Sequence, residues 1–278
     1  MSPEVAIPNP AAAATARGSD DGARPAIALG DTLPSAPHVV SRLVSLTDAD
    51  SDTRDLLAAI DRDPALTARI LRTANSPFFA QTRSVTSVTR AVVVLGLPMI
   101  RNLTLGLTVW DATTSHLTPQ QARTLWEHSL AVAHAAQFLA TRTRLCAGGD
   151  AFTAGLLHDV GKMILAKQFP DAYRPLLAEA AMTPLLPESE RAAVGHDHAE
   201  IGALLFERWR LPKVLVEAVA HHHDPTLVPG VAGLVGAVNT LLGCSDDDRE
   251  AAFERAAAAG VTEELWRENL ERGAAAAL

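Results

Sequence analysis

Residues 155–162 of this 278-residue chain read GLLHDVGK and set an imidazole, His158, beside a carboxylate, Asp159, in an apolar segment that we predict to be helical. Burying such polar groups is unfavourable unless each is hydrogen-bonded or bound to an ion. More histidines lie upstream, at His128, and downstream, at His198 and in the run 221–223. Histidines that converge in space on an aspartate are the usual material of a metal site.

Helical geometry limits which of these side chains can meet. Neighbouring residues on a helix point about 100° apart, so His158 and Asp159 can share an ion only if it lies between their two directions. The remaining ligands must then come from other helices. His128 and His134 are six residues apart, about 240° around the axis, so at most one faces the centre, and we select His128.

The composition predicts an all-α protein. Aromatic residues make up only 4% of the chain while alanine and leucine dominate, which favours helices over strands. A net charge of −8 argues against binding to nucleic acid, because that requires dense lysine and arginine. Two cysteines without a paired motif, and no secretory leader, predict a cytoplasmic protein. The sequence contains no apolar run of about 18 residues, so we predict no membrane span.

Changes in composition, together with turn and helix-capping signals, suggest how the chain is organised. Residues 1–30 have the composition of a disordered tail, and 31–116 and 117–243 read as two helical subdomains, followed by peripheral helices in 244–278. Asp63-Pro64 marks one helix start. Thr118 with Gln121 forms a capping box for a long helix that we expect from about Pro119 to Arg144, with a break at Gly148 to Asp150. We expect His196, just before the next cap at Asp197, to face solvent.

Several of these motifs carry a family resemblance. His128, the HDVGK segment at 158–162, His198 and the pair His222-His223 resemble the HD superfamily of helical metal-dependent phosphohydrolases, especially the layout of its HD-GYP branch. The segments LPSAP at 33–37, DPAL at 63–66, LWEHS at 125–129, HAEIG at 198–202 and WRLP at 209–212 are similar to the HDOD domain, a relative widespread in bacterial signalling. The resemblance implies an HD-superfamily-like bundle preceded by an N-terminal helical subdomain.

The resemblance also implies a set of metal ligands. In this chain they are His128, His158, Asp159, His198, His222 and His223. Asn239 stands where an HD enzyme supplies its final aspartate, and a neutral amide holds a cation less well. Lys162 resembles the lysine that contacts substrate phosphate in HD-GYP enzymes, whereas nothing after Asp224 resembles their Gly-Tyr-Pro signature.

These departures favour a regulatory role over catalysis. We predict a non-catalytic bacterial signal-transduction module with a degenerate metal site, acting through signalling proteins or a bound nucleotide, and no cofactor is certain. The alternative is a phosphodiesterase that uses a divalent ion such as Fe, Mn, Zn or Ni, and a third hypothesis is a purely structural helical scaffold.

Overall fold

The computed structural model describes residues 33–37, 40–41, 53–76, 79, 84–179, 186–224 and 230–277. The chain divides into residues 1–32 and a compact unit of residues 33–278, and only the second is described below. The tail predicted for residues 1–30 and most of the helix predicted after Pro37 lie outside the described residues. Within these residues all regular secondary structure is helical and no strand occurs, which confirms the all-α prediction.

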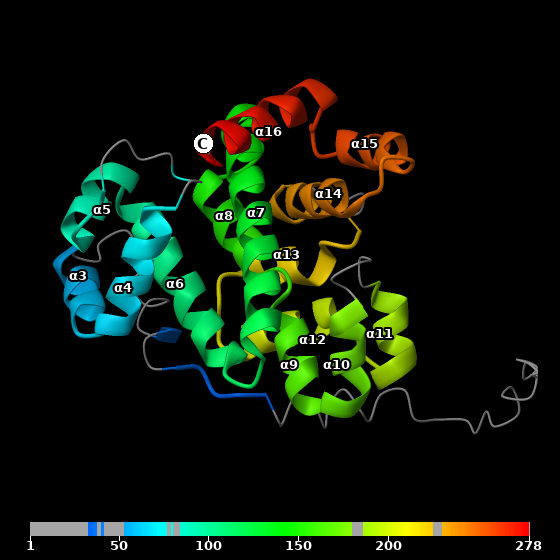
Figure 1. Cartoon of the computed structure of the whole chain (residues 1–278), viewed down its shortest axis with the longest axis horizontal. Coiled ribbons are helices and arrows are strands. Elements are labelled where there is room, and N and C mark those ends of the chain that lie inside the picture. Colours follow the sequence, from blue (N-terminus) through cyan, green and yellow to red (C-terminus); the bar gives the residue numbers. More distant parts are fainter. Residues whose placement is uncertain are drawn as a thin grey trace, which may run out of the picture. The chain divides into compact units, whose positions relative to one another are not determined.

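The first helices lead up to the long α6 (Figure 1). They are α3 (Thr53–Asp61), α4 (Pro64–Ala74), α5 (Val88–Leu95) and α6 (Leu97–Thr114). The Asp63 carboxylate accepts a hydrogen bond from the Leu66 N–H at 3.0 Å, so α4 starts where its Asp-Pro signal predicts. Gly96 separates α5 from α6 with φ of 85°, a conformation that favours glycine.

The helices that carry the polar site come next. They are α7 (Pro119–Thr143), α8 (Gly148–Leu157), α9 (Val160–Gln168), α10 (Pro170–Glu179), α11 (Pro187–Val194), α12 (His198–Arg208), α13 (Lys213–His221) and α14 (Val231–Gly243). The capping box predicted for α7 forms between Thr118 and Gln121. The long helix ends at Thr143, with Arg144 left-handed, which agrees with the end expected near Arg144. The break lies just before Gly148 to Asp150, which begin α8 rather than forming the break themselves.

Two glycines allow the helices of the site to approach closely. A Cβ on Gly155 of α8 would lie 2.7 Å from the Ala133 Cα of α7, and a Cβ on Gly161 of α9 would lie 1.9 Å from the His198 carbonyl oxygen of α12. Neither contact leaves room for a methyl group. The α7–α8 and α9–α12 pairs, side by side in Figure 1, are therefore held close enough for short polar side chains to meet between them.

The C-terminal region forms α15 (Arg249–Ala257) and α16 (Glu263–Ala277). α15 packs on α14 and α16 packs on α7, and the Trp266 side chain is buried while Leu270 remains exposed. Among the described residues, no helix has the length and apolar character needed to cross a bilayer.

Candidate metal centre

The His-Asp pair lies between two helices rather than within one. α8 ends at Leu157, α9 begins at Val160, and Asp159 has φ of −94° and ψ of 9°, outside the helical range. The prediction that the pair lies on a continuous helix was therefore wrong. The Lys162 N–H donates to the Asp159 carbonyl at 3.0 Å, a tight i,i+3 turn at the start of α9.

His158 is held in one orientation by its own helix. Its side chain has no exposed surface, and its Nδ1–H donates to the Gly155 carbonyl at 2.8 Å. A neutral imidazole with Nδ1 protonated presents an unshared electron pair at Nε2. That Nε2 lies 3.4 Å from Asp159 Oδ2 and makes no hydrogen bond within the described residues.

His128 approaches from α7 and is the most accessible nitrogen on this side of the site. Its side chain is 34% exposed, and its Nε2 lies 3.8 Å from Asp159 Oδ2. The same Nε2 donates a hydrogen bond to Asn239 Oδ1 at 3.0 Å, which links α7 to α14. Asn239, which the resemblance to HD enzymes aligns with their final aspartate, therefore contacts the cluster through His128.

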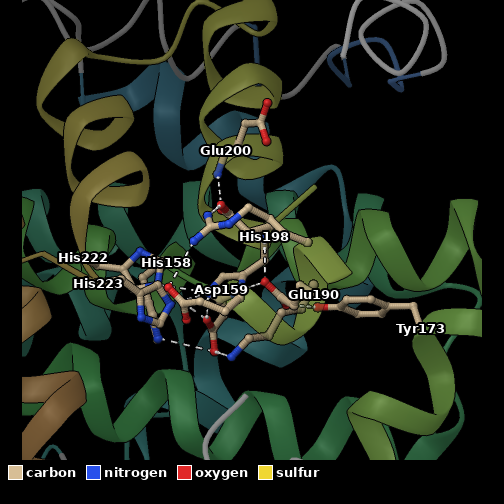
Figure 2. A network of polar contacts seen from close by, with 12 residues as sticks. His158, Asp159, Tyr173, Glu190, His198, Glu200, His222 and His223 are labelled. Atoms are coloured by element: carbon tan, nitrogen blue, oxygen red, sulfur yellow. Dashed lines mark hydrogen bonds and ion pairs between the residues drawn. The ribbon is translucent and has the colours of Figure 1, made fainter. Parts of the chain in front are cut away.

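His198 begins α12 and is anchored by a residue that the sequence analysis did not single out. Glu190, on α11, is fully buried and accepts hydrogen bonds from His198 Nδ1 at 2.6 Å and from the His198 backbone N–H at 2.9 Å. The Tyr173 hydroxyl of α10 donates to the other oxygen of Glu190, so the carboxylate lies between the two side chains in Figure 2. Such outer hydrogen bonds fix the tautomer and orientation of a ligating histidine.

His222 and His223 follow the end of α13. The Nδ1–H of His222 donates to the Val219 carbonyl at 2.8 Å, and its Nε2 lies 3.1 Å from His198 Nε2. His223 Nε2 lies 2.8 Å from the same His198 nitrogen. Three ring nitrogens from two helix ends thus converge on one point.

Two groups of three ligand atoms result, and Asp159 stands between them. The first contains His128, His158 and Asp159, the second His198, His222 and His223, and within each group the ligand atoms lie within 4.8 Å of one another. Asp159 Oδ2 faces the first group, while Asp159 Oδ1 lies 3.2 Å from His198 Nε2 and 3.9 Å from His222 Nε2. Figure 2 shows the rings gathered around this carboxylate.

The donor set fits a divalent metal ion. Because His198 and His222 both donate through Nδ1, their neutral rings direct unshared pairs at one another across 3.1 Å, which is repulsive. A cation at the centre, either an extra proton or a metal ion, removes this repulsion. Asp159 Oδ1 and His158 Nε2 are also buried without a hydrogen bond in the described part of the chain. An imidazole-rich site of this kind suits Fe, Zn or Ni.

The protonation states of the proposed ligands depend on how deeply each is buried and on the charged groups beside it. Burial lowers the pKa of His128 to about 4 and of His223 to about 3, so both rings are neutral at pH 7. Burial alone would raise the pKa of Asp159, but its electrostatic interactions with the His158 ring and with the Lys162 ammonium outweigh it and hold that pKa well below its usual range. Burial opposes the charged form of His198 too, yet the carboxylates of Asp159 and Glu190, 3.2 and 2.6 Å from its two ring nitrogens, raise its pKa overall.

Lys162, which the resemblance to HD-GYP enzymes suggests as a phosphate contact, forms an ion pair with the proposed metal ligand Asp159. Its Nζ lies 2.7 Å from Asp159 Oδ2, and its side chain is only 11% exposed. The ammonium therefore occupies the carboxylate oxygen that faces His128 and His158.

His134, His196 and His221 lie outside both groups of ligand atoms. His134 contacts the rings of Phe79 and Phe152, at centroid distances of 4.7 and 5.3 Å. His221 is exposed. The expectation that His196 faces solvent was wrong: it is 4% exposed, with Nδ1 3.3 Å from Glu200 Oε2, because the chain entering α12 is covered.

Comparison with known proteins gives a family and several relatives. A family model described as the HDOD domain matches residues 33–225. An uncharacterized protein of Treponema pallidum is 28% identical over 209 residues, 72% of this chain and 40% of that protein. Ribonuclease Y of Thermus thermophilus is 31% identical over 140 residues, 50% of this chain and 20% of that protein. This chain spans less than half the length of these curated relatives.

Solved structures with the same fold include three bacterial proteins. A Shewanella amazonensis protein provisionally named a phosphohydrolase aligns with a TM-score of 0.70 and 26% identity, covering 89% of this chain and 96% of that one. An HDOD domain protein of unknown function from Geobacter sulfurreducens gives 0.67 and 25%, covering 91% and 97%. A Marinobacter aquaeolei protein provisionally named a signal transduction protein gives 0.66 and 26%, covering 88% of this chain and 59% of that one.

Proposed function

Because this chain belongs to the HDOD family, we propose that it is a bacterial signalling module without catalytic turnover, whose HD-type site binds at most one divalent ion. The module acts on partner proteins. Its ion-binding site is formed by the six proposed ligands His128, His158, Asp159, His198, His222 and His223. The net charge of −8 favours protein partners over a phosphate backbone.

One observation carries the proposal: the half of the site near His128 is already paired within the protein. The Lys162 ammonium lies 2.7 Å from Asp159 Oδ2, and the Asn239 amide oxygen accepts from His128 at 3.0 Å. Asp159 is the one carboxylate among the six proposed ligands, and Lys162 neutralises it. Two divalent ions in so small a space repel each other strongly unless anionic ligands offset their charge. A centre with two ions is therefore disfavoured.

The other half is the better place for an ion or a proton. His198, His222 and His223 come from the start of α12 and the end of α13, and Asp159 comes from the start of α9. A ligand bound among them stabilises one arrangement of these three helix ends relative to any other. That differential binding is what a regulatory module needs in order to transmit occupancy to a partner.

Metal content and turnover test the proposal together. Protein purified without added metal should contain no more than one ion per chain by elemental analysis. It should not hydrolyse bis-p-nitrophenyl phosphate or cyclic dinucleotides with added Mn²⁺. Asn239→Asp should raise Mn²⁺ affinity because it restores an anionic ligand, whereas the matched change Asn102→Asp, on α6 outside the site, should not. Two ions per chain together with turnover would contradict the proposal.

A metal-dependent phosphohydrolase is the second candidate, and the convergence of six potential ligands beside a lysine favours it. Ribonuclease Y, to which this chain is similar over 140 residues, is named as a ribonuclease. A bound divalent ion would supply a Lewis acid and lower the pKa of a coordinated water. Glu190 would orient His198, and Lys162, released from Asp159, would neutralise a phosphate oxygen.

The same assay separates the candidates. Turnover in the presence of Mn²⁺ that disappears in His158→Ala and persists in His221→Ala would establish the enzyme. His221 is the matched control because it belongs to the same histidine triplet but is exposed and outside both ligand groups.

A further inference from the structure

A hollow lies between α4, α6 and the start of α7, and none of its lining residues is a proposed metal ligand. It has a volume of about 270 Å³ and is partly open to solvent. Its walls include three arginines, two tryptophans and a threonine, namely Arg69, Arg72, Arg123, Trp110, Trp126 and Thr73. This combination of cations and aromatic rings is unusual in a chain of net charge −8 that contains only four tryptophans.

The arginines carry more positive charge than the neighbouring acids neutralise. Arg69 forms an ion pair with Asp111. Arg72 and Arg123 are exposed and have no ion-pair partner among the residues that the structure describes. Burial and then the charge of Arg72 lower the pKa of Arg69, so the guanidinium groups repel one another. An anion placed between them would relieve this repulsion and gain charge-assisted hydrogen bonds.

The aromatic wall offers a surface for a planar group. Trp110 and Trp126 meet edge to face with ring centroids 5.0 Å apart, and the Arg69 guanidinium lies 5.7 Å from the Trp126 ring centroid. Trp110 is buried and backs the hollow, while Trp126 is half-buried at its rim. Indole rings and guanidinium planes are the surfaces on which nucleobases stack in proteins.

We propose that this hollow binds a small aromatic phosphate, represented by a purine nucleoside monophosphate, with its phosphate on Arg72 and Arg123 and its base against Trp126. The volume is just below the range of about 300–1,000 Å³ that is typical of ligand sites, which suits one nucleotide rather than a dinucleotide. The proposal is independent of the metal centre and of the function proposed above.

Calorimetric titration with guanosine monophosphate, in low salt and with EDTA present, tests this directly. We expect saturable binding that weakens as salt is added, because the phosphate contributes through charge. Guanosine and ribose 5-phosphate should each bind at least tenfold more weakly, a loss of about 1.4 kcal/mol. No binding of guanosine monophosphate at millimolar concentration, or equal binding of ribose 5-phosphate, would overturn the proposal.

Single substitutions then assign the site. Arg72→Ala and Arg123→Ala remove exposed side chains, so they should leave the fold intact while raising the Kd about tenfold each, equivalent to about 1.4 kcal/mol. Arg267→Ala, an exposed arginine on α16, is the matched control and should leave the Kd unchanged. Trp126→Leu should weaken binding of the nucleotide but not of ribose 5-phosphate. A Kd unchanged in both pocket arginine variants, or binding lost in His223→Ala, would refute the assignment.

Discussion

Gly161→Ala tests whether the contact between α9 and α12 sets the geometry of the metal centre. The added Cβ would lie 1.9 Å from the His198 carbonyl oxygen and 2.9 Å from the Gly202 backbone nitrogen. Ordinary contact begins at 3.4 Å, so the shortfall against the oxygen is 3.4 − 1.9 = 1.5 Å. Both neighbours are backbone atoms and cannot rotate away, so the two helices must separate. That separation would carry Asp159 away from His198, whose facing atoms now lie 3.2 Å apart.

The magnitude follows from overpacking. Forcing extra volume into a packed interior costs about 1–3 kcal/mol, occasionally more, while alanine gains at most about 1 kcal/mol over glycine in a helix. We expect a net loss of about 2 kcal/mol, which lowers Tm by about 4–8 °C for a domain of this size class. Loss of support around a metal ligand typically weakens metal binding about 10–100-fold. Thermal unfolding by circular dichroism and titration with Mn²⁺ or Ni²⁺ measure both quantities.

Gly149→Ala provides the matched control. Its added Cβ would meet only the Asn102 amide nitrogen, at 2.5 Å, and that group ends a flexible side chain that can move. We expect Tm and metal affinity to stay close to those of the unsubstituted protein. If Gly161→Ala left both quantities as unchanged as the control does, the close α9–α12 contact would not position the site and the reasoning would fail.

Three further predictions concern the buried polar groups. Glu190→Gln turns an acceptor of three hydrogen bonds into a group with a competing donor. We therefore expect the free energy of unfolding in urea to fall by about 1–3 kcal/mol and metal binding to weaken. Glu188→Gln, exposed on α11, is the control and should change neither quantity. Lys162→Ala frees Asp159 Oδ2, so Mn²⁺ affinity should rise while metal-free stability falls; an unchanged affinity would argue against competition by the ammonium. Burial lowers the pKa of His134 to about 4 from an unfolded value of about 6.5, so its contribution to stability is complete above pH 6.5 and is lost as the pH falls toward 4, at about 1.4 kcal/mol per pH unit. Urea unfolding between pH 4.5 and 7 should show a shallower pH dependence in His134→Leu, and an identical slope would contradict this account.

Local signals made much of the fold predictable. Asp63-Pro64 and the Thr118 capping box act within one turn of the chain, and each marks a helix start where the structure has one. The Gly148 signal misled because glycine also tolerates the first turn of a helix, and the chain had already turned at Arg144. His196 misled because exposure depends on what packs over a residue and not on its distance from a cap.

The site itself required information that no spacing carries. The histidines were found because they are rare and flank an aspartate, and the structure brings His128, His158, His198, His222 and His223 to that aspartate from four parts of the chain. Glu190 went unnoticed because it lies on the short α11, eight residues before His198, among exposed acids such as Glu188. Its role depends on a buried contact between two helices, so only its position in space distinguishes it.

The helix α7 presents Trp126 and His128 only two residues apart, which is about 200° around its axis. It therefore forms a partition with the aromatic hollow on one side and the histidine cluster on the other. Because Trp126 and His128 are carried on the same rigid helix, a roll or slide of α7 would displace both side chains together.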